Sequence, residues 1–165
     1  MPPITVQPLT ATDRPALLAL VREHWGEERI VSRGRAHDVR VLEGLVARGT
    51  AEVGFALYRR EGAEAELVLL HALPAGHGLG TALVEALVEH LAAAGVARLW
   101  LITTNDNLDA LRFYQRRGFS LVAVHRRALD RSRLLKPSIP LTGPNGIPLR
   151  DEIELERLLV PAVGS

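Results

Sequence analysis

Residues 74–81 have the sequence PAGHGLGT and lead directly into a segment with the apolar spacing of an amphipathic helix. Gly76, Gly78 and Gly80 let a ligand approach the backbone closely, because glycine has no Cβ. The unpaired N–H groups of a first helical turn, together with the helix dipole, then favour an anion such as a phosphate. By itself, the turn is equally compatible with a tight strand-to-helix connection that binds nothing.

A second segment, residues 103–119, places polar and aromatic side chains on one face of a helix. Its sequence is TTNDNLDALRFYQRRGF, in which Asn107, Ala110 and Tyr114 are spaced by three and four residues. Residues at those spacings share a helix face. The nearly continuous apolar run at residues 98–103 predicts a strand, buried on both faces, between the two helices.

The two segments together resemble the GNAT superfamily, the acetyl-CoA-dependent N-acetyltransferases. The family's loop has the pattern Arg/Gln-x-x-Gly-x-Gly/Ala, and residues 75–80 fill it with Ala75 in place of the Arg or Gln. The second signature of the family is matched by Asn107, Ala110, Tyr114, Gly118 and Phe119. The resemblance is good over residues 51–125 and looser before them, while residues 126–165 resemble an uncharacterised bacterial branch.

This resemblance implies acetyl-CoA as the cosubstrate, with its diphosphate on the loop amides. The side chain missing at Ala75 normally assists the loop, but the amides carry most of the contact. In the family a strand N–H, by position that of Val68, binds the oxyanion, and Leu70 pairs with the pantetheine arm. Thr81 could donate its hydroxyl to a phosphate or simply occupy the first helical turn. The implied cofactor-binding residues are Val68, Leu70, Ala75, Gly76, His77, Gly78, Leu79, Gly80, Thr81, Asn107 and Ala110.

Tyr114 is the residue implied to protonate the departing CoA thiolate, with Asn107 near the pantetheine amides. The alternative is a core tyrosine that packs the helix against the sheet. The expected reaction is therefore transfer of an acetyl group to a primary amine. A non-catalytic acyl-CoA-binding or sensory domain on the same fold is the other function considered.

A general base is required because the attacking amine must be neutral. A lysine-like ammonium at pH 7 lies ~3.4 units below its reference pKa of ~10.4, so deprotonation costs roughly 4.6 kcal/mol. Glu64 and Glu66 are the candidates, because strand alternation puts both on one face. His71 is a second candidate, expected on the opposite face unless a β-bulge redirects it. Water as the base, two solvent-facing carboxylates and a structural histidine are the alternatives.

Several arginines have weaker claims. Arg112, Arg116 and Arg117 could reach the CoA 3′-phosphate or form a solvated helix face. The resemblance puts residues 31–38 beside the acceptor pocket, where Arg33 and Arg35 would suit a carboxylate or phosphate on the acceptor. A flexible basic loop is the alternative there.

Composition limits the remaining function classes. The 165 residues predict a single domain, 1–165, which the resemblance implies is an N-acetyltransferase domain. The net charge of +1 favours neither nucleic acid nor a membrane surface. The chain has no cysteine, and His24, His37 and Asp38 lack metal-ligand spacing, so no metal is expected. With no signal peptide or membrane-spanning stretch apparent, the expected location is the cytoplasm. The expected partners are acetyl-CoA and a small or peptide amine, and a homodimer is compatible with the sequence.

The periodicity predicts an α/β (α+β) fold in which a mixed central sheet carries helices on both faces. The resemblance implies that this sheet is mostly antiparallel, as in the GNAT fold. Residues 26–40 are expected to be irregular. Residues 126–150 are also expected to be mostly irregular, with a helical turn near 129–136, and to cover the acceptor pocket or an interface. Strands are expected near 4–9, 41–47, 51–58, 64–73, 98–103, 119–125 and 153–159, and helices near 13–25, 79–94 and 107–117.

Overall fold

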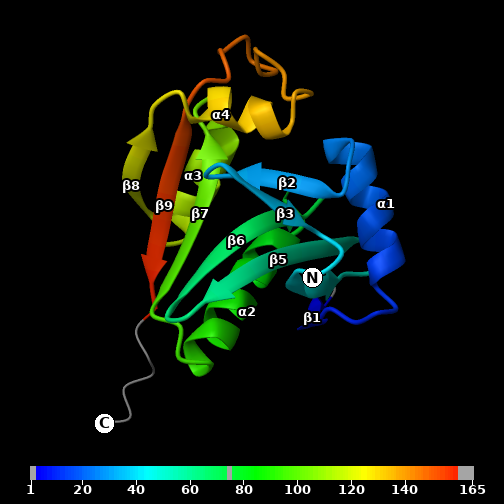
Figure 1. Cartoon of the computed structure of the whole chain (residues 1–165). Coiled ribbons are helices and arrows are strands. Elements are labelled where there is room, and N and C mark those ends of the chain that lie inside the picture. The colour runs from blue at the N-terminus through cyan, green and yellow to red at the C-terminus, as the bar shows by residue number, and fades with distance from the viewer. Residues whose placement is uncertain (1–2, 74–75, 160–165) are drawn as a thin grey trace.

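A computed structural model of the chain describes residues 3–73 and 76–159, and its centre is a seven-stranded sheet (Figure 1). The strand order is β1-β4-β5-β6-β7-β9-β8, and every neighbouring pair is antiparallel except β6 with β7. This confirms the mixed, mostly antiparallel sheet. Its strands are β1 (Thr5–Pro8), β4 (Glu43–Arg48), β5 (Val53–Glu61), β6 (Glu64–His71), β7 (Arg98–Thr104), β8 (Ser120–His125) and β9 (Glu152–Leu158).

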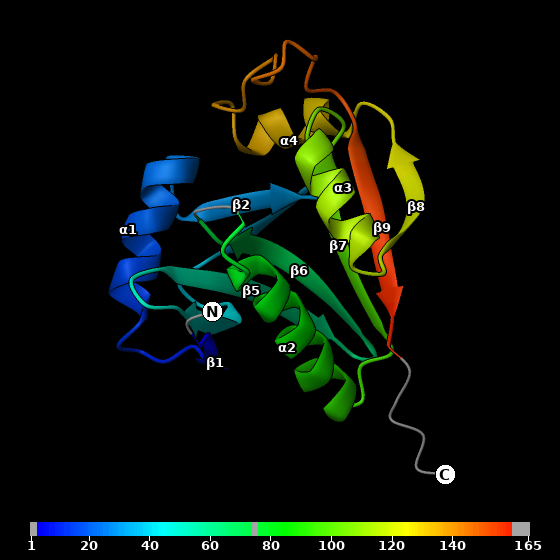
Figure 2. The ribbon, with the colours of Figure 1, turned by 180° about the vertical axis from the view of Figure 1, so that it is seen from behind.

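Helices cover both faces of the sheet, as expected (Figures 1 and 2). On one face, α1 (Arg14–Trp25) buries Leu17 and Val21 against apolar side chains of β4, β5 and β6. On the other face lie α2 (Leu79–Ala93) and α3 (Leu108–Arg116), and the apolar stripe of α2 forms the larger core cluster. None of the described helices has the length and apolar content needed to cross a membrane.

The N-termini of α1 and α3 differ in whether a side chain caps the helix. Asn107 caps α3, since its side-chain oxygen accepts from the Ala110 N–H at 3.1 Å. Asp13 occupies the N-cap position of α1, but its carboxylate accepts from the backbone N–H and the hydroxyl of Thr10 instead of capping the helix.

Two segments expected to be irregular contain regular structure. Residues 26–40 include a two-stranded hairpin, β2 (Arg29–Ser32) and β3 (Arg35–Asp38), so the irregular assignment was wrong there. Its turn residues Arg33 and Gly34 both have positive φ, which is the geometry of a type I′ hairpin without the usual Asn-Gly signal. The helical turn expected near 129–136 is a full helix, α4 (Ala128–Leu135).

A bulge in β6 reverses the face on which its last residues lie. Leu67 pairs with Tyr58 and Leu69 with Leu57, so Val68 is the extra residue. His71 is consequently directed to the α1 face, the face that Glu66 occupies before the bulge. Simple alternation, which placed His71 on the opposite face from Glu66, was therefore wrong.

The parallel pairing of β6 with β7 ends at Leu67 and Leu101. Beyond that point the two strands separate, and the site described next lies in the gap.

Candidate active site

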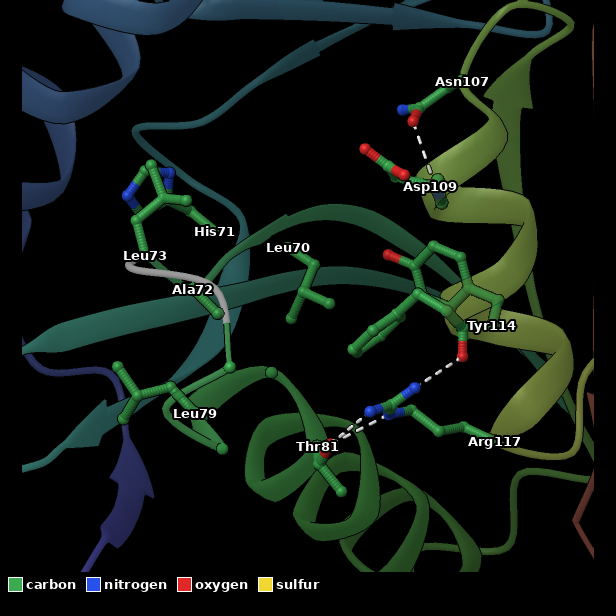
Figure 3. A pocket seen from close by; sticks show the side chains of 15 residues that line it. Leu70, His71, Ala72, Leu73, Leu79, Thr81, Asn107, Asp109, Tyr114 and Arg117 are labelled. Atoms are coloured by element: carbon green, nitrogen blue, oxygen red, sulfur yellow. Dashed lines mark hydrogen bonds between the residues drawn. The ribbon is translucent and has the colours of Figure 1, made fainter.

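A cavity of about 600 Å³ lies where β6 and β7 separate, between the start of α2 and the inner face of α3 (Figure 3). It collects most of the residues of the two sequence motifs. The lining residues are Leu70, His71, Ala72, Leu73, Gly76, Gly78, Leu79, Gly80, Thr81, Asn107, Asp109, Ala110, Phe113, Tyr114 and Arg117.

The glycine loop meets this cavity at the first turn of α2. Gly78 is the N-cap residue, with a φ of +85° that an L side chain rarely adopts. A Cβ on Gly80 would lie 3.1 Å from Phe113 Cζ, so this glycine allows α2 and α3 to approach. The first N–H groups of α2 have no partner inside the helix and are available to an anionic ligand.

Arg117 adds a cation beside the same turn. Its guanidinium lies 3.7 Å from the centroid of the Phe113 ring and donates to the Thr81 hydroxyl at 2.7 and 2.9 Å. Arg116 faces a neighbouring hollow with Glu85, and Arg112 is exposed. The sequence did not distinguish Arg112, Arg116 and Arg117 as candidates to contact CoA. Of these three, only Arg117 lines the cavity.

Tyr114 points into the cavity from α3, across from Leu70 of β6 (Figure 3). Its ring makes edge-to-face contacts with Phe113 and Phe119, at centroid separations of 5.1 and 5.4 Å. Burial raises the pKa of the Tyr114 phenol above its ordinary value, so the hydroxyl keeps its proton at neutral pH. No hydrogen-bond partner of this hydroxyl occurs within residues 3–73 and 76–159.

Glu66 is the buried carboxylate of β6. It accepts a hydrogen bond from the Ser32 hydroxyl, and its other oxygen lies 3.5 Å from Nε2 of His37. Burial raises the pKa of Glu66 to about 7, an effect that Ser32 opposes and nearby Glu152 reinforces. Burial also lowers the pKa of His37, so its imidazole is neutral at pH 7 and does not neutralise the carboxylate.

The other two base candidates have different surroundings. Glu64 is exposed and bonds to the Arg98 guanidinium at 2.8 Å. His71 lines the large cavity and packs against His24, with ring centroids 5.0 Å apart. Burial, followed by the charge of His24, lowers the pKa of His71, which favours the neutral imidazole.

A second cavity, of about 230 Å³, lies on the hairpin face of the sheet. Glu66 belongs to this cavity and is not a lining residue of the larger one. The residues that line the smaller cavity are Arg35, Arg59, Glu61, Glu64, Glu66, Arg98, Trp100 and Glu154.

The predicted site residues therefore do not all lie in one cavity. Leu70, the described loop residues other than His77, and the α3 motif share the large cavity. The His77 imidazole is turned away to Glu52, at 3.1 Å, and Val68 is partly buried against the α1 cluster. Ala75 lies outside the described residues.

Sequence reasoning missed the contact of Ser32 and His37 with Glu66. The polar run at residues 31–38 signalled that these side chains could serve the acceptor pocket, but it did not show that the run folds back on β6. Among the described residues, no group of three or more His, Asp or Glu side chains is placed to hold a metal ion.

Comparison with known proteins identifies the family of the chain. Residues 13–119 match the model of the acetyltransferase (GNAT) family. The chain is 34% identical to the uncharacterised protein YdhI of Bacillus subtilis, over 83% of this chain and 87% of that protein. It is 30% identical to the ribosomal protein bS18-alanine N-acetyltransferase of Escherichia coli K12, over 74% and 84%.

A solved structure extends the likeness to the fold. A GNAT family acetyltransferase from Elizabethkingia anophelis, crystallised with acetyl-CoA bound, superposes with a TM-score of 0.68. The match covers 94% of this chain and 98% of that one at 20% sequence identity, so it speaks for the fold alone.

Proposed function

The chain belongs to the GNAT acetyltransferase family, and from that premise we propose that it transfers the acetyl group of acetyl-CoA to a primary amine. One observation carries the proposal: the large cavity joins the glycine loop, the gap between β6 and β7, and Tyr114. A CoA thioester needs these three features, since it has an anionic end, an extended arm and a leaving thiolate.

In this proposal the CoA diphosphate lies on the backbone amides of residues 76–81. Thr81 and Arg117 contact it with side chains, and Arg117 supplies the cation that Ala75 does not provide. Because the His77 side chain is turned to Glu52, His77 contributes its amide. The pantetheine arm then extends along Leu70, with Asn107 and Ala110 on its other side.

The acetyl group lies near Val68, the extra residue of the bulge, and the Val68 N–H binds the oxyanion. The amine nitrogen attacks the thioester carbon, and the carbon–sulfur bond breaks as the tetrahedral intermediate collapses. Glu66 accepts the amine proton, directly or through water, and Tyr114 donates its phenolic proton to the sulfur. A pKa of about 7 suits Glu66 to this role at neutral pH. Glu64 is engaged by Arg98, which leaves His71 as the other base to test.

Two measurements test the proposal. Calorimetry should detect binding of CoA, and free-thiol release from acetyl-CoA should depend on an added amine. Glu66→Gln should reduce turnover more than His71→Asn if the carboxylate is the base. Binding of CoA without thiol release across a broad amine panel would favour a non-catalytic acyl-CoA-binding domain, the alternative that the alanine at position 75 suggests.

A further inference from the structure

We propose that the cavity of about 230 Å³ on the hairpin face is the acceptor pocket, and that its acceptor is a small amino acid-like molecule carrying an amine and an anionic group. This inference rests on the proposed function, because it names the acceptor class of the same reaction. It concerns the face of β6 opposite to the glycine loop.

The charges in the wall of this cavity are paired, with one exception. Glu64 and Glu154 both bond to Arg98, and Glu61 pairs with Arg35 and Arg59. Glu66 is the exception: within the described part of the chain, no guanidinium or ammonium group lies within ion-pairing distance of it. A ligand ammonium would supply the missing cation and would place the reacting nitrogen at the base.

An anion fits the other side of the cavity. Arg35 and Arg59 share the single carboxylate of Glu61, at 2.7 and 3.2 Å, so two guanidinium groups divide one negative charge. Guanidinium donors suit the paired oxygens of a carboxylate or phosphonate. Arg59 is directly opposite Glu66 across the β5–β6 ladder, which separates the two backbones by one strand spacing. The amine and the anion of the acceptor are therefore only a few bonds apart.

The position along β6 is right for acetyl transfer. Glu66 lies in the last stretch where β6 and β7 still pair, and Val68 lies just beyond it. At ~3.3 Å per residue, Glu66 is about 7 Å along the strand from the bulge that would hold the acetyl group, so the amine attacks from a position between the two, about 3–3.5 Å from the acetyl carbon. The amine enters from the hairpin face and the thioester from the α2 face, so the two substrates do not compete for space.

The volume of this cavity limits the size of the acceptor. The Lys136 ammonium donates to the Arg29 carbonyl at 3.2 Å, and the Arg33 N–H donates to Glu152 at 3.1 Å. Both Lys136 and Glu152 are buried, so these contacts join the hairpin to the C-terminal part of the chain. A cavity of about 230 Å³ is smaller than the ~300–1,000 Å³ usual for drug-sized ligands. A free amino acid-like molecule fits within a cavity of this volume, whereas a polypeptide would extend beyond it.

The experiment compares acceptors that differ only in the anionic group. Thiol release from acetyl-CoA is measured with glycine and β-alanine, with the methyl ester of each, and with an alanyl hexapeptide. The free acids should have kcat/KM values on the order of tenfold or more above the esters, the difference expected for a charge-assisted hydrogen bond. The hexapeptide should be the poorest acceptor.

Variants then assign the preference to this cavity. In Arg35→Gln and Arg59→Gln, the ratio of kcat/KM for the free acid to kcat/KM for its ester should fall toward one, mainly because KM for the acid rises. Arg40→Gln is the matched control, because Arg40 lies at the end of the same hairpin, pairs with Asp38 and is not a lining residue. It should keep the ratio of the unaltered protein.

The outcomes separate this inference from the proposed function. Preferred turnover of the hexapeptide, or an acid-to-ester ratio that survives both substitutions, would overturn the pocket assignment and leave the acetyltransferase proposal standing. CoA binding with no thiol release for any amine would overturn both.

Discussion

Burial makes Tyr114 and Glu66 hold their protons more tightly than ordinary side chains of their type, and the two effects serve different roles. In the proposed mechanism, the raised pKa of Tyr114 keeps a proton available for the leaving thiolate. The raised pKa of Glu66, about 7, allows it to gain and lose a proton near neutral pH. Neither shift needs a nearby metal ion or an unusual hydrogen bond, because removal from water disfavours the charged form.

Tyr114→Phe should lower kcat by about 10²- to 10⁴-fold, the usual contribution of a general acid, with little change in CoA affinity. The phenyl ring keeps the contacts with Phe113 and Phe119 and loses only the proton. Tyr58→Phe is the control, because the Tyr58 hydroxyl bonds to Glu43 and His90 away from the cavity. Unchanged kcat in Tyr114→Phe, where chemistry limits the rate, would leave water as the proton donor.

Glu66→Gln should change how stability depends on pH. Because the folded protein holds the Glu66 proton up to a pKa of about 7, above the ordinary 4.5, the folded state binds more protons than the unfolded state between these values. This contribution to stability is complete below pH 4.5 and is lost as pH rises to 7. Each pKa unit is worth about 1.4 kcal/mol.

The glutamine variant has no such loss, so its free energy of unfolding should improve relative to the unaltered protein from pH 5 to pH 8. Urea unfolding at several pH values measures this difference. Parallel curves would mean that Glu66 has no raised pKa in the folded state.

At the scale of single elements, the site depends on the places where regular structure is interrupted. The glycine loop starts α2 with a residue of positive φ, and the bulge at Val68 breaks the β5–β6 ladder. The start of a helix has N–H groups without a partner inside the helix, and in the proposed mechanism these amides and the Val68 N–H bind the diphosphate and the oxyanion.

Gly78→Ala should weaken CoA binding by about tenfold or more. An alanine at a φ of +85° costs roughly 1–2 kcal/mol, and relief of that strain turns the loop amides away from the ligand. Gly95→Ala is the matched control, because Gly95 has a φ of +88°, lies after the other end of α2 and has open space around an added Cβ. Calorimetry and thermal unfolding should show similar destabilisation in both variants and weaker CoA binding in Gly78→Ala alone. Equal CoA affinity in the two variants would remove the loop from the binding site.

At the scale of the whole molecule, residues 126–150 join the hairpin to the sheet instead of forming a free linker. Arg133 of α4 donates to the carbonyls of Pro140 and Leu149 at 2.8 and 2.6 Å. The Leu149 N–H in turn donates to the Leu141 carbonyl at 2.9 Å. The segment is thus tied to itself and, through Lys136, to the hairpin.

Arg133→Met should accelerate amide hydrogen exchange at Gly143 and Leu149 by about 10- to 100-fold, since charge-assisted hydrogen bonds contribute about 1.5–3 kcal/mol. Arg131→Met is the control, because Arg131 is exposed on the same helix. Exchange in the central strands should stay slow in both variants. Equally fast exchange at these amides before and after the Arg133 substitution would contradict an ordered segment held by Arg133.

The amino-acid sequence by itself determined the parts of the site that lie close together in the chain. Asn107, Ala110 and Tyr114 share a helix face because of helical periodicity, and Asn107 caps that helix. The glycine loop could be located because its glycines stand at the junction of a strand and a helix. Such features depend on residues only a few positions apart, so local geometry is sufficient to predict them.

Only the tertiary structure decided the surroundings of the base and the acceptor. Ser32 donates a hydrogen bond to Glu66, 34 positions away in the chain. The hairpin that carries Ser32 turns at Arg33 and Gly34, without the Asn-Gly pair that usually marks such a turn. The bulge that redirects His71 depends on the register between two strands, and the selection of Arg117 over its neighbours depends on the packing of α2 against α3. Burial sets the pKa of Glu66, and burial comes from segments distant in sequence, so no local pattern could reveal it.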